Sequence, residues 1–283
     1  MAEKNRKRII IYYQTLIDLT PLISVLNKNS KQIVTDITLA SIHFGVNADK
    51  TPYIHLNDNS PNSSKFQKVF SQLREIKNIQ FNGEPVKVNL LIGGAGTAFN
   101  NLFSNYNTYY NLLKVSLENE LDFIDGFNLD IEEEVNIDNI INLVNDLKRD
   151  FPSKSIVFAP LAGSLSTDEP GMGGFSYKEL DNKIGSLIDY YNVQCYGEYS
   201  EALFKQITDN GYPPEKIVMG MLTGQDLNGI INQLETIVND KTGRPTNTFG
   251  GVAVWEYFNA PPSSPDYPYV WCEIMYHILS NDK

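Results

Sequence analysis

Short apolar runs alternate with helical segments along the whole chain. The apolar runs span residues 8–13, 33–44, 86–92, 125–132, 155–161, 188–196, 216–221 and 250–255. Most of them are nearly all apolar, which is typical of parallel strands that are buried on both faces. The segments between them repeat apolar residues at helical spacing, as the fourth such segment does at Ile137, Ile140, Ile141, Val144 and Leu147. Eight strand–helix units predict an α/β fold, a (β/α)8 barrel of the TIM type.

The length of the chain fits one such barrel. It has 283 residues, and a barrel of this class typically needs about 250. No linker-like stretch interrupts the pattern. Residues 1–283 are therefore expected to form a single catalytic domain.

The fourth run has two different faces. Its residues alternate between a polar set (Asn128, Asp130, Glu132) and an apolar set (Phe127, Leu129, Ile131). Burying unpaired carboxylates is costly, so a chain that keeps two of them inside a barrel is expected to use them for chemistry. Glu133 and Glu134 favour the alternative of a solvated edge strand. In barrels of this class the functional groups lie at the carboxyl ends of the strands, where Glu132, Tyr196 and Trp255 fall.

The charge of the chain limits its partners. The formal net charge is −11 and no basic run is long enough for a phosphate-binding stripe, so nucleic acid is not expected and a neutral or cationic ligand fits better. About five apolar residues follow the polar stretch 1–8, too few for a signal peptide or a membrane span, so we expect a cytoplasmic protein that does not enter a membrane. Cys195 and Cys272 lie in apolar segments and are expected to be buried free thiols. We expect the chain to act as a monomer.

No cofactor and no metal site is expected. The turn Gly93-Gly94-Ala95-Gly96 has neither the G-x-G-x-x-G spacing of a dinucleotide site nor the Lys-Ser/Thr ending of a P-loop. Its glycines indicate a tight turn or a backbone that lies close to a ligand. The three histidines, His43, His55 and His277, are spread without the spacing of metal ligands and are expected to be ordinary packed or exposed residues.

The stretch from Asp125 to Glu132 resembles the D-G-x-D-x-D-x-E motif on the fourth strand of glycoside hydrolase family 18, the chitinases and endo-β-N-acetylglucosaminidases. Asp125, Gly126, Asp130 and Glu132 are in register with that motif. Other strands agree. They include Tyr12-Tyr13-Gln14 at the end of the first strand, residues 88–94 for the S-x-G-G strand, Ala159-Pro160 on the fifth, Gln194-Cys195-Tyr196 for the Q-x-Y of the plant and fungal-type branch, and residues 251–255 for the tryptophan floor. The resemblance spans essentially the whole chain.

The resemblance implies roles for individual residues. In the family the glutamate is the general acid, the aspartate orients the acetamido group of the substrate and the strand-six tyrosine supports that group; these roles fall on Glu132, Asp130 and Tyr196. The residues implied to bind substrate are Asn128, Gln194, Trp255, Tyr12, Gly93 and Gly94. The implied activity is cleavage of β-1,4 linkages in N-acetylglucosamine polymers or N-glycan cores, with retention, because the acetamido oxygen replaces a protein nucleophile. A weakly active or inactive carbohydrate-binding protein, a lectin or an inhibitor, is the alternative.

Two further acids are not expected to act as a nucleophile. Asp226 comes late after the seventh run and should begin a helix, while Glu256 should point away from the lumen if Trp255 faces it. Only 28 residues separate Met221 from Gly250. That is too few for the α+β insertion of many bacterial-type members, so the groove should be shallow and open, which favours cleavage within chains.

Two positions depart from the family pattern. Asn128 stands where the family usually has the first Asp of D-x-D-x-E, and Leu91 replaces the Ser of S-x-G-G. Asn is nearly isosteric with Asp, so we expect it to hydrogen-bond Asp130 and to tune activity rather than abolish it. Without a second carboxylate beside it, Asp130 should ionise more readily, and its charge should raise the pKa of Glu132. Asn128→Asp is expected to raise the rate unless Leu91 makes the floor too apolar, in which case adding Leu91→Ser should recover it.

Overall fold

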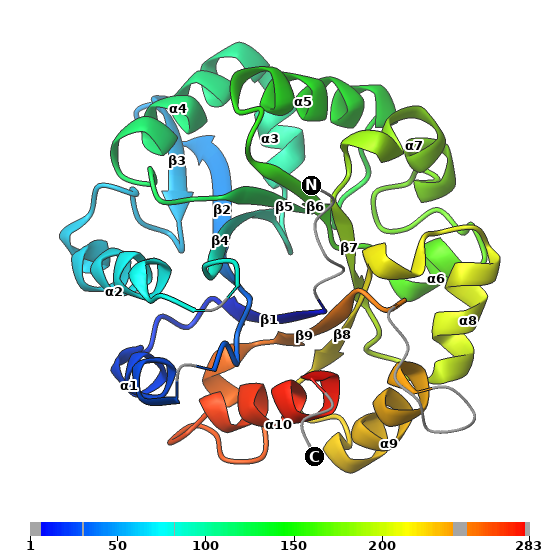
Figure 1. Cartoon of the computed structure of the whole chain (residues 1–283). Helices are drawn as coiled ribbons and strands as arrows, with labels where there is room; N and C mark the ends of the chain where they lie inside the picture. The colour runs from blue at the N-terminus through cyan, green and yellow to red at the C-terminus, as the bar shows by residue number, and fades with distance from the viewer. Residues whose placement is uncertain (1–6, 30, 82, 240–247, 281–283) are drawn as a thin grey trace.

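The eight expected strands close into a barrel that helices surround (Figure 1). The computed structural model describes residues 7–280 apart from residues 30, 82 and 240–247. The barrel strands are β1 (Arg8–Tyr13), β2 (Asp36–Val46), β4 (Lys87–Gly93), β5 (Gly126–Asp130), β6 (Ser155–Phe158), β7 (Tyr190–Gln194), β8 (Ile217–Leu222) and β9 (Gly251–Trp255). Neighbouring barrel strands are parallel, and β1 pairs with both β2 and β9, which closes the ring. The predicted (β/α)8 barrel is confirmed.

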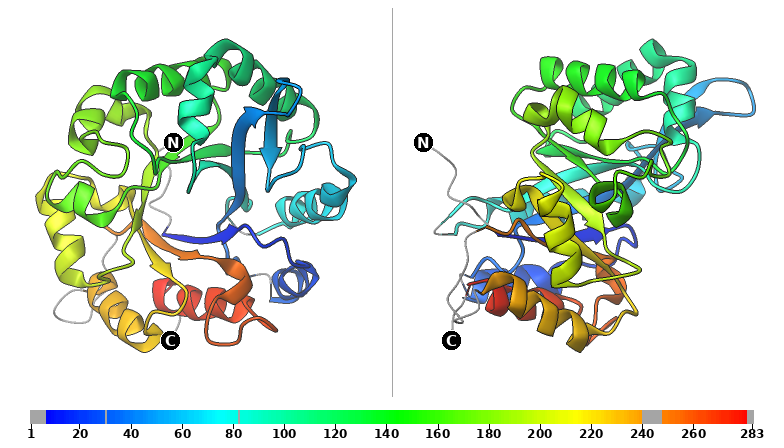
Figure 2. Two further views of the ribbon diagram at one scale, coloured as in Figure 1. Left: turned by 180° about the vertical axis from the view of Figure 1, so that it is seen from behind. Right: turned by 90° about the vertical axis from the view of Figure 1, so that its right-hand side faces the viewer.

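The α-helices lie around the outside of the barrel (Figure 2). They are α1 (Thr20–Asn29), α2 (Gln67–Asn78), α3 (Ala98–Ser104), α4 (Tyr106–Asn119), α5 (Ile137–Asp150), α6 (Ala162–Ser166), α7 (Tyr177–Ile184), α8 (Glu201–Asp209), α9 (Leu227–Val238) and α10 (Tyr269–Ser280), with 3-10 turns η1 (Ser64–Phe66), η2 (Gly185–Leu187), η3 (Pro214–Lys216) and η4 (Tyr257–Asn259). In the described part of the connection between β8 and β9, α9 is the regular element, as expected without an α+β insertion. None of the described helices is both long enough and apolar enough to cross a membrane.

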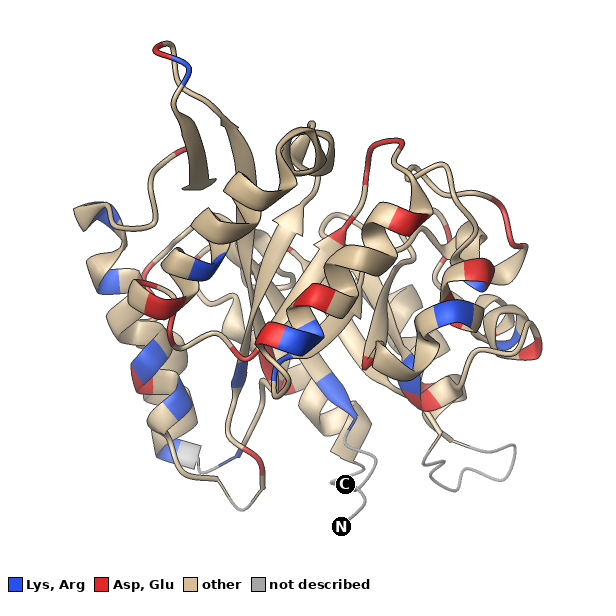
Figure 3. Ribbon diagram, turned by 90° about the horizontal axis from the view of Figure 1, so that it is seen from above, with Lys and Arg blue, Asp and Glu red and all other residues tan. Residues whose placement is uncertain are grey.

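The sequence did not predict the ninth strand. β3 (Pro52–Leu56) pairs antiparallel with the end of β2 and forms a hairpin. The segment has five residues and begins with a proline, so it lacked the length and the composition of a recognisable strand. β2 also begins and ends later than the predicted run 33–44. Figure 3 shows this hairpin rising above the carboxyl ends of the barrel strands.

Two apolar layers fill the barrel and its surroundings. On β5 and directly after it, Phe127, Leu129 and Ile131 face the helices and are buried in the large core between strands and helices, which confirms the predicted alternation. A smaller cluster fills the lumen. It consists of Ile10, Tyr12, Ala40, Leu91, Val157, Tyr190, Val218 and Ala253, with Trp255 packed against it. The polar side chains of β5 therefore lie against an apolar barrel interior.

The two cysteines are buried and unpaired. Cys195 follows β7, and Cys272 lies in α10. The predicted free thiols are confirmed.

Candidate active site

The carboxyl ends of the barrel strands bring most of the predicted site residues together. Asp130 is the last residue of β5 and is 6% exposed, and Glu132 follows it as a half-buried residue. Both carboxyl groups line one groove of about 320 Å³. The same groove is lined by Gln194, Tyr196, Trp255, Gly93 and Gly94. Six strands therefore contribute to it: β4, β5, β7, β9, β2 through Ser41 and His43, and β8 through Leu222.

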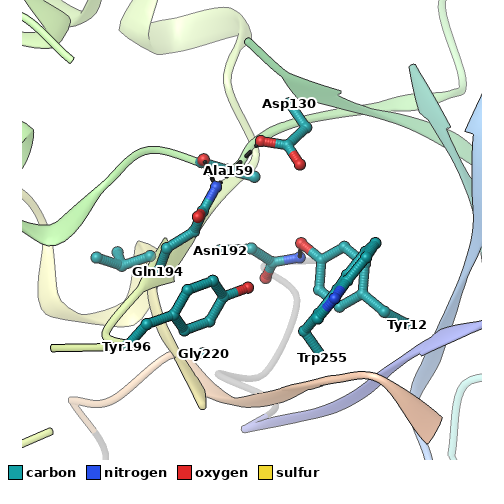
Figure 4. Close-up of a pocket in the computed structure, with 9 residues that line it drawn as sticks. Tyr12, Asp130, Ala159, Asn192, Gln194, Tyr196, Gly220 and Trp255 are labelled. Atoms are coloured by element: carbon teal, nitrogen blue, oxygen red, sulfur yellow. Dashed lines mark hydrogen bonds between the residues drawn. The ribbon is translucent and has the colours of Figure 1, made fainter. Parts of the chain in front are cut away.

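The carboxyl group of Asp130 is held by the amide of Gln194 (Figure 4). The Gln194 Nε2 donates to Asp130 Oδ1 at 3.1 Å and to the backbone carbonyl of Ala159 at 2.9 Å. Both protons of this nitrogen are thus engaged. Gln194 therefore orients Asp130 at the edge of the groove.

Two glycines let β4 lie close to the end of β5. Gly93 has a φ of +101°, and a Cβ atom added there would lie 2.2 Å from the carbonyl oxygen of Asp130. Gly94 has a φ of +79°, and its amide donates to that same carbonyl at 2.9 Å. These glycines line the groove as expected, and they also fix the backbone of Asp130.

A buried hydroxyl lies beneath the groove. The Tyr12 hydroxyl accepts hydrogen bonds from Asn128 Nδ2 at 2.9 Å and from Asn192 Nδ2 at 3.0 Å. The Tyr12 ring meets the Trp255 ring edge-on at 5.2 Å between centroids. Asn128 is fully buried and lies below the groove, so it supports Tyr12 instead of lining the binding surface. The expected hydrogen bond from Asn128 to Asp130 was wrong, because Asn128 Nδ2 donates to Tyr12 and Asn128 Oδ1 has no partner among the described residues.

A small cavity opens between these groups. Its walls include Tyr12, Asp130, Asn192, Tyr196 and Trp255, and its volume is about 10 Å³, the space of one water-sized group. Asn192 is 2% exposed, and its Oδ1 has no hydrogen-bond partner among the described residues. The cavity therefore offers an unused acceptor next to a carboxyl group. The alternation of Asn192 with Gln194 and Tyr196 in the sequence placed it on this polar face, but nothing marked it as a site residue.

The acids and the phenol of the site all hold their protons more tightly than usual. Burial raises the pKa of Asp130 well above its usual value, and the nearby charge of Glu132 raises it further. Burial also raises the pKa of Glu132, while the nearby side-chain amide of Gln194 acts in the opposite direction. Burial, followed by Tyr12 and the two carboxyl groups, raises the pKa of Tyr196.

The expectation that Asp130 ionises more readily was made by comparison with a carboxylate at position 128, and that comparison stays a prediction. Relative to a free carboxyl group the pKa of Asp130 is raised, because burial removes water from it. Burial is the largest cause of the raised pKa of Glu132.

The other two acids considered from the sequence have structural partners. Glu256 Oε2 accepts hydrogen bonds from the amides of Gln14 at 3.1 Å and Thr15 at 2.7 Å. Asp226 caps α9 by accepting from the amide of Asn228 at 3.1 Å. Among the described residues, the carboxyl groups that line the groove are those of Asp130 and Glu132. Asp226 begins a helix as predicted, and Glu256 is not among the residues that line the groove.

The sequence did not predict that β2 forms one wall of the groove. Ser41 and His43 of β2 line it, and Ser41 Oγ lies 3.0 Å from His43 Nε2. His43 was expected to be an ordinary packed or exposed histidine. Its shared strand parity with Ser41 was the signal that could have placed both residues on the lumen side.

Solved structures of two fungal enzymes are similar to this chain over nearly its full length. A fungal endo-β-N-acetylglucosaminidase from glycosyl hydrolase family 18 is 28% identical, with a TM-score of 0.82 over 98% of this chain and 99% of that one. The chitinase ChiC from Aspergillus fumigatus is 28% identical, with a TM-score of 0.77 over 95% of this chain and 98% of that one. The catalytic domain of a hyperthermophilic chitinase from Pyrococcus furiosus shares the fold at 15% identity and a TM-score of 0.67, covering 97% of this chain and 96% of that one. Comparisons with protein-family models and with curated proteins give no match.

Proposed function

Since this chain shares the barrel and the fourth-strand motif of the family 18 glycosidases, we propose that it hydrolyses β-1,4 linkages next to N-acetylglucosamine, in chitin-like polymers or in N-glycan cores. The reaction retains the configuration of the anomeric carbon. It uses the substrate's own acetamido group in place of a protein nucleophile.

In the first step Glu132 acts as the general acid. Its raised pKa favours the protonated carboxyl group, and this proton passes to the glycosidic oxygen as the bond to the anomeric carbon breaks. The carbonyl oxygen of the acetamido group forms a new bond to that carbon, which gives an oxazolinium ion. Asp130 accepts the acetamido N–H, and the Tyr196 hydroxyl donates to the acetamido oxygen.

In the second step a water molecule attacks the anomeric carbon on the face that the leaving group occupied. The Glu132 carboxylate takes a proton from this water, and the bond to the acetamido oxygen breaks. Each step inverts the carbon, so two steps restore the β configuration. Glu132 ends the cycle protonated, ready for the next linkage.

The part of the groove lined by Asp130, Tyr196 and Trp255 carries this proposal. An acetamido group needs a polar edge for its N–H and C=O and an apolar wall for its methyl group, and these three side chains offer both. A retaining glycosidase with a protein nucleophile would need a second carboxyl group on another strand, about 5–5.5 Å from the acid. Both groove-lining acids belong to β5 or its end, so substrate assistance fits the site better.

The alternative is a protein that binds the same sugars without cleaving them. Glu132 favours the enzyme, because a half-buried acid with a raised pKa costs stability and serves no evident packing role.

Assays on chitin oligosaccharides and on N-glycosylated proteins test the proposal. We expect the wild type to release products whose first-formed anomer is β by proton NMR. Glu132→Gln should lower kcat by at least about 10²-fold while binding persists. Glu84→Gln, an exposed change at the opposite end of the barrel, is the matched control and should leave kcat unchanged. Binding without release of any product by the wild type would support the lectin or inhibitor alternative.

A further inference from the structure

The catalytic side of the barrel carries the negative charge of the molecule. We define this side as the eight segments that follow the barrel strands, residues 14–19, 47–63, 94–97, 131–136, 159–176, 195–200, 223–226 and 256–268. They contain twelve acids and one basic residue, Lys50. The acids are Asp18, Asp49, Asp58, Glu132, Glu133, Glu134, Asp168, Glu169, Glu198, Asp226, Glu256 and Asp266. The net charge of these segments is thus −11, equal to that of the whole chain, so the rest of the molecule is neutral overall.

Ion pairs do not compensate this charge. At the other end of the barrel, acids pair with bases from neighbouring helices, as in Arg74–Asp122 at 2.5 Å, Lys77–Asp125 at 2.8 Å and Lys148–Asp189 at 3.4 Å. Of the twelve acids on the catalytic side, Asp18 alone has an ion-pair partner within the described chain, Lys68. Figure 3 shows acidic loops along the upper side of the barrel, where the strands end.

The field of these acids reaches the groove. Burial lowers the pKa of His43, which lines the groove, while the charges of Asp58 and Glu133 act to raise it. Glu198 lies two residues after Tyr196 and is exposed. A cleft lined by charge of one sign concentrates ligands of the opposite sign and speeds their association by about 10–10³-fold.

The base of the groove independently favours a ligand that brings hydrogen-bond donors. Asn192 and Asp130 both line the small cavity, and the buried Oδ1 of Asn192 has no hydrogen-bond partner among the described residues. Such acceptors match a ligand that brings N–H groups and disfavour an anion. No three metal-ligating side chains cluster among the described residues, so this charge is not arranged as a chelating site.

We propose that the enzyme prefers N-acetylglucosamine polymers from which some acetyl groups have been removed. Each free amino group on such a polymer carries a positive charge when protonated, and the acidic catalytic side attracts it. The cleaved sugar must still be acetylated, because its carbonyl oxygen attacks the anomeric carbon. This inference rests on the proposed function and narrows its substrate class to cationic, partly deacetylated chains.

Two charge-matched triple variants test the proposal. The first, Glu134→Gln/Glu169→Gln/Glu198→Gln, removes three exposed charges from the catalytic side. The second, Glu84→Gln/Glu118→Gln/Glu215→Gln, removes three exposed charges at the opposite end and is the control. Both variants change the net charge by the same amount, so a general effect of charge on solubility would affect the two variants equally. The measured quantity is the ratio of kcat/KM on partly deacetylated oligosaccharides to kcat/KM on fully acetylated ones of the same length.

We expect the wild-type ratio to exceed one at low salt. It should fall about tenfold in the first variant, stay within about twofold in the control, and approach one for all proteins at about 1 M salt, where charges are screened within about 3 Å. Equal ratios in the wild type and both variants at low salt would overturn the proposal.

A fully deacetylated oligosaccharide separates this inference from the proposed function. It has no acetamido oxygen to attack the anomeric carbon, so it should bind, inhibit competitively in a salt-dependent way, and remain uncleaved. Salt-dependent binding by a protein that hydrolyses neither substrate would contradict the proposed activity while leaving the recognition of cationic glycans intact. Hydrolysis of acetylated chains with no salt-dependent binding of this inhibitor would overturn the inference and leave the activity standing.

Discussion

Asp130 destabilises the fold near neutral pH because its carboxyl group is buried. Its pKa in the folded protein is raised above the unfolded value, so its favourable contribution is complete below the unfolded pKa and is lost as pH rises through the folded pKa. Asp130→Asn keeps an oxygen acceptor for Gln194 but cannot ionise. We expect this variant to gain about 1–3 kcal/mol in free energy of unfolding at pH 8 and progressively less toward pH 4.

Urea unfolding at the two pH values measures this gain. Asp266→Asn, at an exposed position, serves as the control and should show a difference near zero at both pH values. A gain for Asp130→Asn that is the same at pH 4 and pH 8 would mean that ionisation of Asp130 does not limit stability.

Asn128 and Leu91 form a pair at the barrel floor. They are in register on β5 and β4, both are fully buried, and Leu91 belongs to the apolar cluster of the lumen. A carboxyl group at position 128 would face this apolar surface and would have to replace the amide that donates to Tyr12. We therefore expect Asn128→Asp alone not to raise kcat.

Adding Leu91→Ser supplies a hydroxyl donor beside the new acid. The double variant should exceed the single Asn128→Asp variant by about threefold in kcat, or about 0.7 kcal/mol in the barrier, and its pH–rate profile should shift. Rates measured from pH 4 to pH 9 decide this. Identical profiles for the single and double variants would show that position 128 does not tune the catalytic acids.

At the level of elements, the contact between β4 and β5 depends on Gly93. An alanine there would adopt a strained φ and place its Cβ against the carbonyl of Asp130. We expect Gly93→Ala to lower the free energy of unfolding by about 3 kcal/mol and to reduce kcat, because Asp130 must move.

Two other glycines distinguish the effect of backbone strain on stability from the effect of the contact with Asp130. Gly224 has a φ of +98° with open space around its added Cβ, so Gly224→Ala should show the backbone strain alone, about 1 kcal/mol. Gly197 has neither feature, and Gly197→Ala should change stability by less than about 0.5 kcal/mol. A loss for Gly93→Ala no larger than that for Gly224→Ala would exclude the contact with Asp130 as its cause.

Elements that are marked by their own stretch of sequence could be predicted, whereas features that depend on contacts with distant residues could not. The barrel strands followed from long apolar runs, and the alternation in β5 correctly placed Asp130 and Glu132 toward the lumen. The β3 hairpin escaped because it is short, begins with Pro52 and is fixed by pairing with β2. The partner of Asn128 and the raised pKa of Asp130 also escaped, since both depend on depth and on contacts between distant strands that a linear pattern does not contain.

At the scale of the molecule, the described part of the short connection between β8 and β9 places no inserted domain beside the groove. The hairpin of β2 and β3 rises on one side, and Ser41 and His43 of β2 line the groove itself. We expect a long chain to lie across this groove and to be cut internally. Early products from a polymer should therefore span many lengths, as mass spectrometry over the first minutes can show. Disaccharide as the main product from the start would instead indicate stepwise release from chain ends.

The concentration of charge at one end of the barrel also gives the molecule a permanent dipole along the barrel axis. Near a positively charged surface such a dipole experiences a torque, which turns the strand carboxyl ends toward that surface. Protein adsorbed on an amine-coated bead should therefore lie with its groove against the bead, whereas protein attached through the opposite end should keep its groove open. On a solid cationic polymer the same torque would present the groove to the fibre before any sugar ring is bound.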